Sequence, residues 1–284
     1  MQLRNTSQAH AYLFGSRYLR ELAHCAVIVA HPDDEVVGAG SLIHKLNDVT
    51  IVHASNGAPR AAKILEKSEF LTPKDYGEAR IKACACALAI AKIPAERIIE
   101  FGYMALDLPH RLMSLTRSVM AFLLNSSSEI VLTNAYDGGH PDHDATAFAT
   151  HTAIDLIKRS GLKPPVIFEF GLYPDADSRT RVLDFLPGSG KETTIVVLDG
   201  KARKLKLQMF DCLSTQGGPL NASPFESEKF RRAPSYDFRR LPGCGAPHYE
   251  SFDWGFSGDD WQDLACAALD QLFPKAEQSS RLDA

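Results

Sequence analysis

Short apolar runs alternate with segments of helical spacing along most of the chain. Residues 25–30, Cys-Ala-Val-Ile-Val-Ala, form an unbroken apolar run, which is typical of a strand buried on both faces of a parallel sheet. Helical spacing follows over residues 36–46, and residues 49–53 have the pattern of a second strand. This order predicts a βαβ unit at the start of the fold.

The same alternation continues to about residue 213. Strands that alternate with helices imply a mostly parallel sheet with helices on both of its faces. We therefore predict an α/β fold of Rossmann-like architecture. The further helices are predicted at 74–92, 109–125 and 144–159, and the further strands near 98–101, 130–133, 166–170 and 194–198.

Beyond residue 213 the pattern changes, because glycines and prolines interrupt the segment 214–276. We expect this segment to be rich in loops and to cover the active edge of the sheet. At 284 residues the chain is close to the size at which a single hydrophobic core stops growing. We expect one domain over residues 1–284, with a core at about 22–213 and a frayed tail from Glu277.

Composition narrows the classes of function. Hydrophobic residues make up 45% and charged residues 23% of the chain, as in ordinary globular proteins. The net charge of −4 offers no basic field for nucleic acid. No apolar run reaches the roughly 18 residues of a membrane-spanning helix, so we expect a cytoplasmic protein without a membrane span. The six cysteines form no C-x-x-C pair, and we expect free, mostly structural thiols.

Two clusters of histidine and acidic residues follow predicted strands. Residues 31–35 (His-Pro-Asp-Asp-Glu) come directly after the first strand, and residues 140–143 (His-Pro-Asp-His) come shortly after the strand at 130–133. Ligands of open α/β sheets bind outside the carboxyl ends of the strands, so both clusters are placed at a site. His31 and Asp34 are three residues apart and can converge on one metal across a turn that starts a helix.

The second cluster contributes further metal donors. Two neutral histidines and one carboxylate, with a fourth position open to water, are the donor set of catalytic rather than structural zinc. Zinc lowers the pKa of a bound water to about 7, far below that of bulk water, and it polarises a carbonyl oxygen. The two clusters together therefore predict a hydrolytic metal site.

Both clusters resemble the signatures of the LmbE-like, or PIG-L, de-N-acetylase family, A-H-P-D-D-E and H-P-D-H, which stand here as residues 30–35 and 140–143. The resemblance implies a zinc-dependent amidohydrolase that removes an N-acyl group, foremost N-acetyl, from an amino sugar or a related amine. The substrate would be a small molecule, with a glycoconjugate as the leading candidate. One Zn²⁺ per chain is implied; Fe²⁺ or another divalent ion, and assembly into a homo-oligomer, remain open.

The resemblance also implies a role for each residue of the clusters. Asp33 would be the general base, and His140 would stabilise the oxyanion or act as a general acid. Asp142 would orient His140. The three zinc ligands would be His31, Asp34 and His143.

Four further residues are expected to contact the substrate. Relatives place substrate-contacting residues where Arg80 and Asp107 stand, although a solvated helix arginine and a helix N-cap are equally good readings of these two. Tyr136 is displaced by two positions from a tyrosine seen in some relatives. His248 lies in the expected cover, in a segment (residues 249–255) that also resembles the family.

Several residues are expected to have only structural roles. Glu35 supplies favourable charge at a helix N-terminus, and His53 has no partner at ligand spacing. The string Gly38-Ala-Gly40 lacks the third glycine of a dinucleotide fingerprint, so we expect no nicotinamide cofactor.

Two other functions remain open at this stage. A metal-dependent phosphoesterase would use similar ligands, but a two-metal enzyme needs more of them than the two clusters supply. The second alternative is a non-catalytic module that binds a sugar or a metal and has the same fold. It remains open because a fold does not entail an activity.

Overall fold

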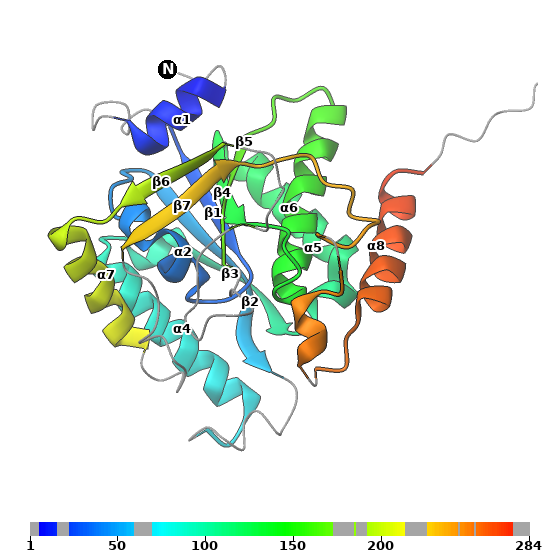
Figure 1. Ribbon diagram of the computed structural model, residues 1–284, viewed down its shortest axis with the longest axis horizontal. Coiled ribbons are helices and arrows are strands. Elements are labelled where there is room, and N and C mark those ends of the chain that lie inside the picture. Colours follow the sequence, from blue (N-terminus) through cyan, green and yellow to red (C-terminus); the bar gives the residue numbers. More distant parts are fainter. Residues whose placement is uncertain are drawn as a thin grey trace, which may run out of the picture.

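The computed structural model describes residues 6–15, 23–59, 70–172, 185, 192–213, 226–243, 245–252 and 254–274. A seven-stranded sheet of order β3-β2-β1-β4-β5-β7-β6 forms its centre (Figure 1). Neighbouring strands are parallel from β3 to β5, whereas β7 is antiparallel to both β5 and β6. The strands are β1 (Cys25–Val29), β2 (Val49–Pro59), β3 (Ile98–Ala105), β4 (Ile130–Asn134), β5 (Val166–Phe170), β6 (Thr193–Val197) and β7 (Ser227–Arg232).

Helices cover both faces of the sheet, which confirms the predicted α/β class (Figure 1). Alternate residues of β1 point to opposite sides, so Val27 and Val29 enter one hydrophobic cluster while Ala26 and Ile28 enter the other. The first cluster is covered by α2 (Asp34–Ile43), α4 (Pro73–Ile90) and α7 (Gly200–Cys212), and α1 (Thr6–Phe14) packs at its margin. The second cluster is covered by α5 (Leu112–Ser126), α6 (Pro141–Arg159) and α8 (Gly258–Leu272).

Helix α1 and two elements near the C-terminus differ from the sequence-based expectation. Helix α1 precedes the predicted core, and both β7 and α8 fall in the segment expected to be loop-rich. The cover is therefore partly regular structure: β7 extends the sheet, and α8 packs against α5. The tail expected from Glu277 lies outside the described residues.

Gly38 shows why helix α2 contains glycine. A Cβ atom at this position would lie 2.0 Å from the ring of Phe170 in β5, which no real contact permits. The glycine thus allows α2 to pack closely on the sheet. Gly38 therefore has a packing role in this helix.

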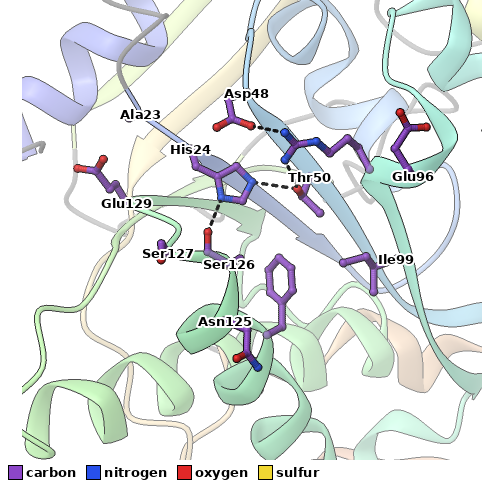
Figure 2. A pocket seen from close by; sticks show the side chains of 12 residues that line it. Ala23, His24, Asp48, Thr50, Glu96, Ile99, Asn125, Ser126, Ser127 and Glu129 are labelled. Carbon is purple, nitrogen blue, oxygen red and sulfur yellow. Dashed lines mark hydrogen bonds and ion pairs between the residues drawn. The ribbon is translucent and has the colours of Figure 1, made fainter. Parts of the chain in front are cut away.

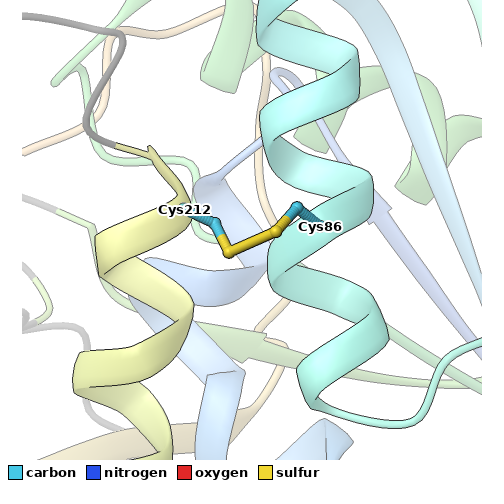
Figure 3. Close-up of a disulfide and its surroundings, with 2 residues drawn as sticks. All are labelled: Cys86 and Cys212. Atoms are coloured by element: carbon cyan, nitrogen blue, oxygen red, sulfur yellow. A yellow bond between two sulfur atoms is a disulfide. The ribbon is translucent and has the colours of Figure 1, made fainter.

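The expectation of free cysteines is wrong for two of the six. Cys86 in α4 and Cys212 at the end of α7 form a disulfide (Figure 3). Sequence spacing did not reveal this pair because its members are 126 residues apart. Cys25, Cys84 and Cys266 are free, and Cys244 lies outside the described residues.

A hollow of about 740 Å³ lies at the amino ends of the parallel strands (Figure 2). Both histidine clusters follow the carboxyl ends of these strands, at the opposite edge of the sheet. His24 occupies its wall, where Nδ1 lies 3.1 Å from the carbonyl oxygen of Ser126 and Nε2 lies 2.9 Å from Oγ1 of Thr50. The charges beside it pair locally, since Arg97 contacts Asp48 at 3.0 Å.

In the part of the chain that is described, no helix combines the length and apolar character needed to cross a membrane.

Candidate metal and catalytic centre

The two histidine clusters meet at the carboxyl ends of β1 and β4. Strand order reverses between these strands, because β2 and β3 lie outward from β1 whereas β5 lies outward from β4. Open α/β sheets bind ligands at such a reversal. A cavity of about 390 Å³ opens there, and His31, Asp33, Asp34, His140 and His143 contribute to its lining.

His31, Asp34 and His143 converge as ligands of a single ion would. Oδ1 of Asp34 lies 3.3 Å from Nε2 of His143, and Oδ2 lies 3.5 Å from Nδ1 of His31. All three side chains are nearly buried, at no more than 12% exposed. Tetrahedral zinc with ligands at about 2.0–2.2 Å places neighbouring donor atoms about 3.3–3.5 Å apart, so these residues fit a divalent ion.

His140 adjoins this trio as a third imidazole. Its Nδ1 accepts a hydrogen bond of 3.0 Å from the backbone N–H of Asp142 and so caps helix α6. A neutral ring in this arrangement carries its proton on Nε2, the nitrogen that remains. The ligating atoms of His31, His140 and His143 lie within 4.8 Å of one another. His140 is therefore placed to bind the ion or to donate a hydrogen bond beside it.

The side chain of Asp142 contacts His31, which corrects the expectation that it orients His140. Its Oδ2 lies 2.9 Å from Nε2 of His31. Backbone N–H groups of Leu106 and Leu108 hold the same carboxylate, at 2.6 and 3.2 Å. A carboxylate that fixes the outer nitrogen of a histidine leaves the other nitrogen free for a metal. Asp142 is thus a positioning residue for the expected ligand His31.

Asp33, which lines the cavity, is held in a strained backbone conformation. Its φ of 133° is rare for a residue with a side chain. The guanidinium of Arg80 contacts its carboxylate and also donates to the carbonyl oxygens of Gly57 (2.9 Å) and Pro32 (3.3 Å). The expected substrate contact Arg80 lines the cavity. Several N–H groups of its guanidinium are, however, already used in the bonds to Asp33, Gly57 and Pro32.

Without metal, burial and nearby charges shift the pKa values of Asp33, His31 and His140 in different directions. Burial raises the pKa of Asp33 against the opposing charge of Arg80. Burial disfavours the charged form of His31, yet its bonds to Asp142 and Asp34 prevail and raise its pKa to about 9. Burial, with the charges of His31 and His143, holds the pKa of His140 well below its usual range. His140 is thus a neutral hydrogen-bond donor, while Asp33 retains the basicity that a general base needs.

An aromatic wall closes one side of the cavity. Trp254 lies 4.7 Å from the ring of His140 and stacks on Phe252, with ring centroids 4.4 Å apart and planes at 12°. The expected substrate contact His248 also lines the cavity, and its ring is perpendicular to that of Phe252. Phe252 and Trp254 belong to segment 249–255, which resembles the family in sequence. The sequence therefore pointed to the segment, but it did not single out these two rings.

The other two expected substrate contacts lie elsewhere. Tyr136 is only 4% exposed, and its hydroxyl donates to the carbonyl oxygen of Arg240, so it belongs to the aromatic core and not to the cavity. Asp107 is the N-cap of a 3-10 turn (Leu108–Arg111). Among the described residues that line the cavity, its neighbours Ala105 and Leu106 appear and Asp107 does not.

The chain is similar to a known protein family and to several solved structures. The family model of the GlcNAc-PI de-N-acetylases, PIG-L, matches residues 26–154. No curated protein matches the sequence. Among solved structures, the A40926 pseudoaglycone deacetylase Dbv21 is similar, with 19% identity, a TM-score of 0.57, and coverage of 74% of this chain and 96% of that one.

Two further structures share the fold. One is N,N'-diacetylchitobiose deacetylase from Pyrococcus horikoshii, with 19% identity, a TM-score of 0.50, and coverage of 78% of this chain and 83% of that one. The other is GalB, the 4-carboxy-2-hydroxymuconate hydratase from Pseudomonas putida KT2440, with 17% identity, a TM-score of 0.52, and coverage of 75% and 98%. At these identities the likeness establishes the fold alone. The family resemblance read from the two motifs is nevertheless confirmed, because residues 26–154, which contain both, match the PIG-L family of GlcNAc-PI de-N-acetylases.

Proposed function

We propose that this protein is a metal-dependent hydrolase that removes an N-acyl group, foremost N-acetyl, from an amino sugar or a related amine. The observation that carries the proposal is the meeting of an ion-binding trio, His31, Asp34 and His143, with the carboxylate of Asp33 in one cavity. The PIG-L match over the same residues supports amide hydrolysis. Because a hydratase shares the fold, the fold itself supports no particular reaction.

The trio would hold the ion. A divalent cation bound there, with zinc favoured by the N and O donors, supplies Lewis acidity for the acyl carbonyl and acidifies a water molecule. Asp142 keeps the ring of His31 in place through its bond to Nε2. The donor set also suits Fe²⁺, so the native metal is settled by analysis of the purified protein.

The remaining residues would move protons and stabilise charge. Asp33 accepts a proton from the attacking water and later delivers one to the departing amine. The Nε2–H of neutral His140 donates to the developing oxyanion. The low pKa of His140 favours this oxyanion-stabilising role over that of a general acid.

The aromatic wall is suited to a sugar. An indole ring can pack against the apolar C–H face of a pyranose ring, and Trp254 is held in place by its stacking on Phe252. A wall beside His140 would hold the ring next to the reacting amide. One similar structure is N,N'-diacetylchitobiose deacetylase, which supports an amino sugar as the substrate.

A substrate screen tests the proposal. The purified protein, with its metal content measured on the same sample, is incubated with N-acetylglucosamine, N,N'-diacetylchitobiose and N-acetylglucosaminyl lipids, and free amine and acetate are quantified. We expect equimolar amine and acetate from at least one of them, with loss of release after chelation. Absence of both products at high enzyme concentration, from a sample that carries its metal, would contradict the proposal.

A further inference from the structure

A second cluster of side chains that can bind a metal lies inside the protein, next to Asp33 and the start of helix α2. Glu35 from α2, His53 from β2 and Cys84 from α4 meet there, and each is 1% exposed or less. Oε1 of Glu35 lies 3.1 Å from Nε2 of His53 and 2.9 Å from Sγ of Cys84. Sγ of Cys84 lies 3.8 Å from the same histidine nitrogen. Each of the three elements thus contributes one donor atom, and the three atoms lie within 4.8 Å of one another.

The donor spacing is close to that of a zinc site. Zinc bonds of about 2.0–2.1 Å to N and O and about 2.3 Å to S place tetrahedral neighbours about 3.3 Å (N to O) and about 3.6 Å (S to N or O) apart. The observed N–O and S–N separations, 3.1 and 3.8 Å, agree within a few tenths of an ångström. Only the S–O pair, at 2.9 Å, must open, by a rotation of the Cys84 or Glu35 side chain.

The histidine of this cluster is already oriented for a metal. Nδ1 of His53 lies 2.7 Å from Oε1 of Glu100 in β3, so a carboxylate fixes the outer nitrogen and Nε2 points at the cluster. Metal-binding histidines are held by this arrangement, and it matches the contact of Asp142 with His31. Among the described residues, the second oxygen of Glu35 accepts one long hydrogen bond, 3.3 Å from the backbone N of Asp33, and it is available as a fourth donor.

We propose that Glu35, His53 and Cys84 bind a divalent metal ion, with zinc favoured by the mixed S, N and O donors. The ion replaces two protons, one from Nε2 of His53 and one from Sγ of Cys84. Without metal, both nitrogens of His53 face carboxylates and need protons, and the thiol donates to Glu35. Exchange of two protons for a dication leaves the charge of the buried cluster unchanged, so binding adds no net charge to the interior.

This buried site is structural and independent of the hydrolytic centre. All of its donors are enclosed, as in structural zinc sites. It ties the start of α2 to β2 and α4, and through Glu35 it contacts the backbone of Asp33. It also differs in chemistry, because the trio of His31, Asp34 and His143 contains no sulfur.

Cobalt substitution tests the proposal through that sulfur. The protein is produced with Co²⁺ as its only divalent metal, and its near-ultraviolet spectrum and metal content are recorded. We expect an intense thiolate-to-cobalt charge-transfer band. Cys84→Ser should lose this band together with one ion per chain, whereas the matched control Cys266→Ser, at a partly exposed free cysteine, should keep both. His31→Ala should lose the other ion and keep the band.

The spectrum of the unaltered protein decides the matter even if Cys84→Ser does not fold. A cobalt-loaded protein without the thiolate band would overturn the proposal, and so would a band that persists at full strength in Cys84→Ser or in His53→Gln. Failure of the proposed hydrolytic function has a different signature, because it leaves the sulfur band intact.

Discussion

The guanidinium of Arg80 rests on the carboxylate of Asp33, with Nη2 2.9 Å from Oδ1 and 3.0 Å from Oδ2. Arg80 belongs to α4, far from both motifs in the sequence, and yet it contacts the residue expected to move protons. This contact orders the carboxylate while leaving it beside the ion-binding trio.

Arg80→Gln should therefore lower kcat by about 10- to 100-fold, part of the 10²- to 10⁴-fold that a positioned base contributes. KM should change little, because much of the guanidinium is committed to Asp33, Gly57 and Pro32. Steady-state kinetics beside the exposed control Arg117→Gln checks this. A large rise in KM with kcat preserved would instead make Arg80 a substrate contact.

Trp254→Ala should raise KM for a sugar substrate by about 2- to 10-fold, the equivalent of the roughly 0.5–1.5 kcal/mol of an aromatic stacking contact. Trp254→Phe should retain most of the affinity, because it keeps an aromatic face beside His140. Metal content should equal that of the unaltered protein in both variants. Unchanged KM in Trp254→Ala would show that the wall does not bind the substrate.

The disulfide should contribute measurably to stability, because it joins α4 to α7 across 126 residues of sequence. Cys212→Ser should lower the free energy of unfolding by roughly 2–4 kcal/mol. Urea denaturation under non-reducing conditions measures the difference, with Cys266→Ser as the control. Equal stability of Cys212→Ser and the unaltered protein would mean that the bond contributes nothing.

His24 should make the fold sensitive to acid. Burial lowers its pKa below the ordinary value of 6.5, although the charge of Asp48 opposes this. Below pH 6.5 the unfolded chain takes up a proton that the folded state resists, so stability is retained above that pH and falls as the pH drops toward the lowered pKa.

The difference in unfolding free energy between about pH 7.5 and about pH 5.5 should therefore be smaller in His24→Gln than in the unaltered protein. The exposed His110→Gln serves as the control. An identical pH dependence in His24→Gln would show that His24 is not a source of acid sensitivity.

The order of strands and helices could be predicted from the sequence where strands are buried on both faces. Strand β7 could not, because Ser227–Arg232 reads Ser-Glu-Lys-Phe-Arg-Arg. Its buried charges are balanced by partners far away in the sequence: Glu228 pairs with Lys206, and Arg231 pairs with Glu169. Helix α8 did carry a readable signal, the Ser257–Asp260 capping box.

The motifs predicted the residues of the candidate hydrolytic centre but not all of their partners. His31, Asp34 and His143 were expected to converge, and the structure brings them together. The contact between Asp142 and His31 depends on the loop after β3, which fixes the carboxylate.

The buried cluster of Glu35, His53 and Cys84 could not be predicted from the sequence either, because its members come from separate elements. Glu35 lies 18 residues from His53 and 49 from Cys84, and only the packing of α2 and α4 on the sheet unites them. Local spacing can therefore predict a site within one turn or loop, whereas a site assembled from three elements requires the tertiary structure.

We propose that one ion-binding trio and one separate base together carry the hydrolysis. This proposal is tested most directly by measuring metal content and turnover on Asp33→Asn and His31→Ala, with the substrate identified by the screen. We expect Asp33→Asn to keep the ion of the trio while kcat falls by about 10²- to 10⁴-fold. His31→Ala should lose both that ion and the activity. Full turnover in Asp33→Asn, or full activity in His31→Ala after the trio's ion has gone, would contradict the account.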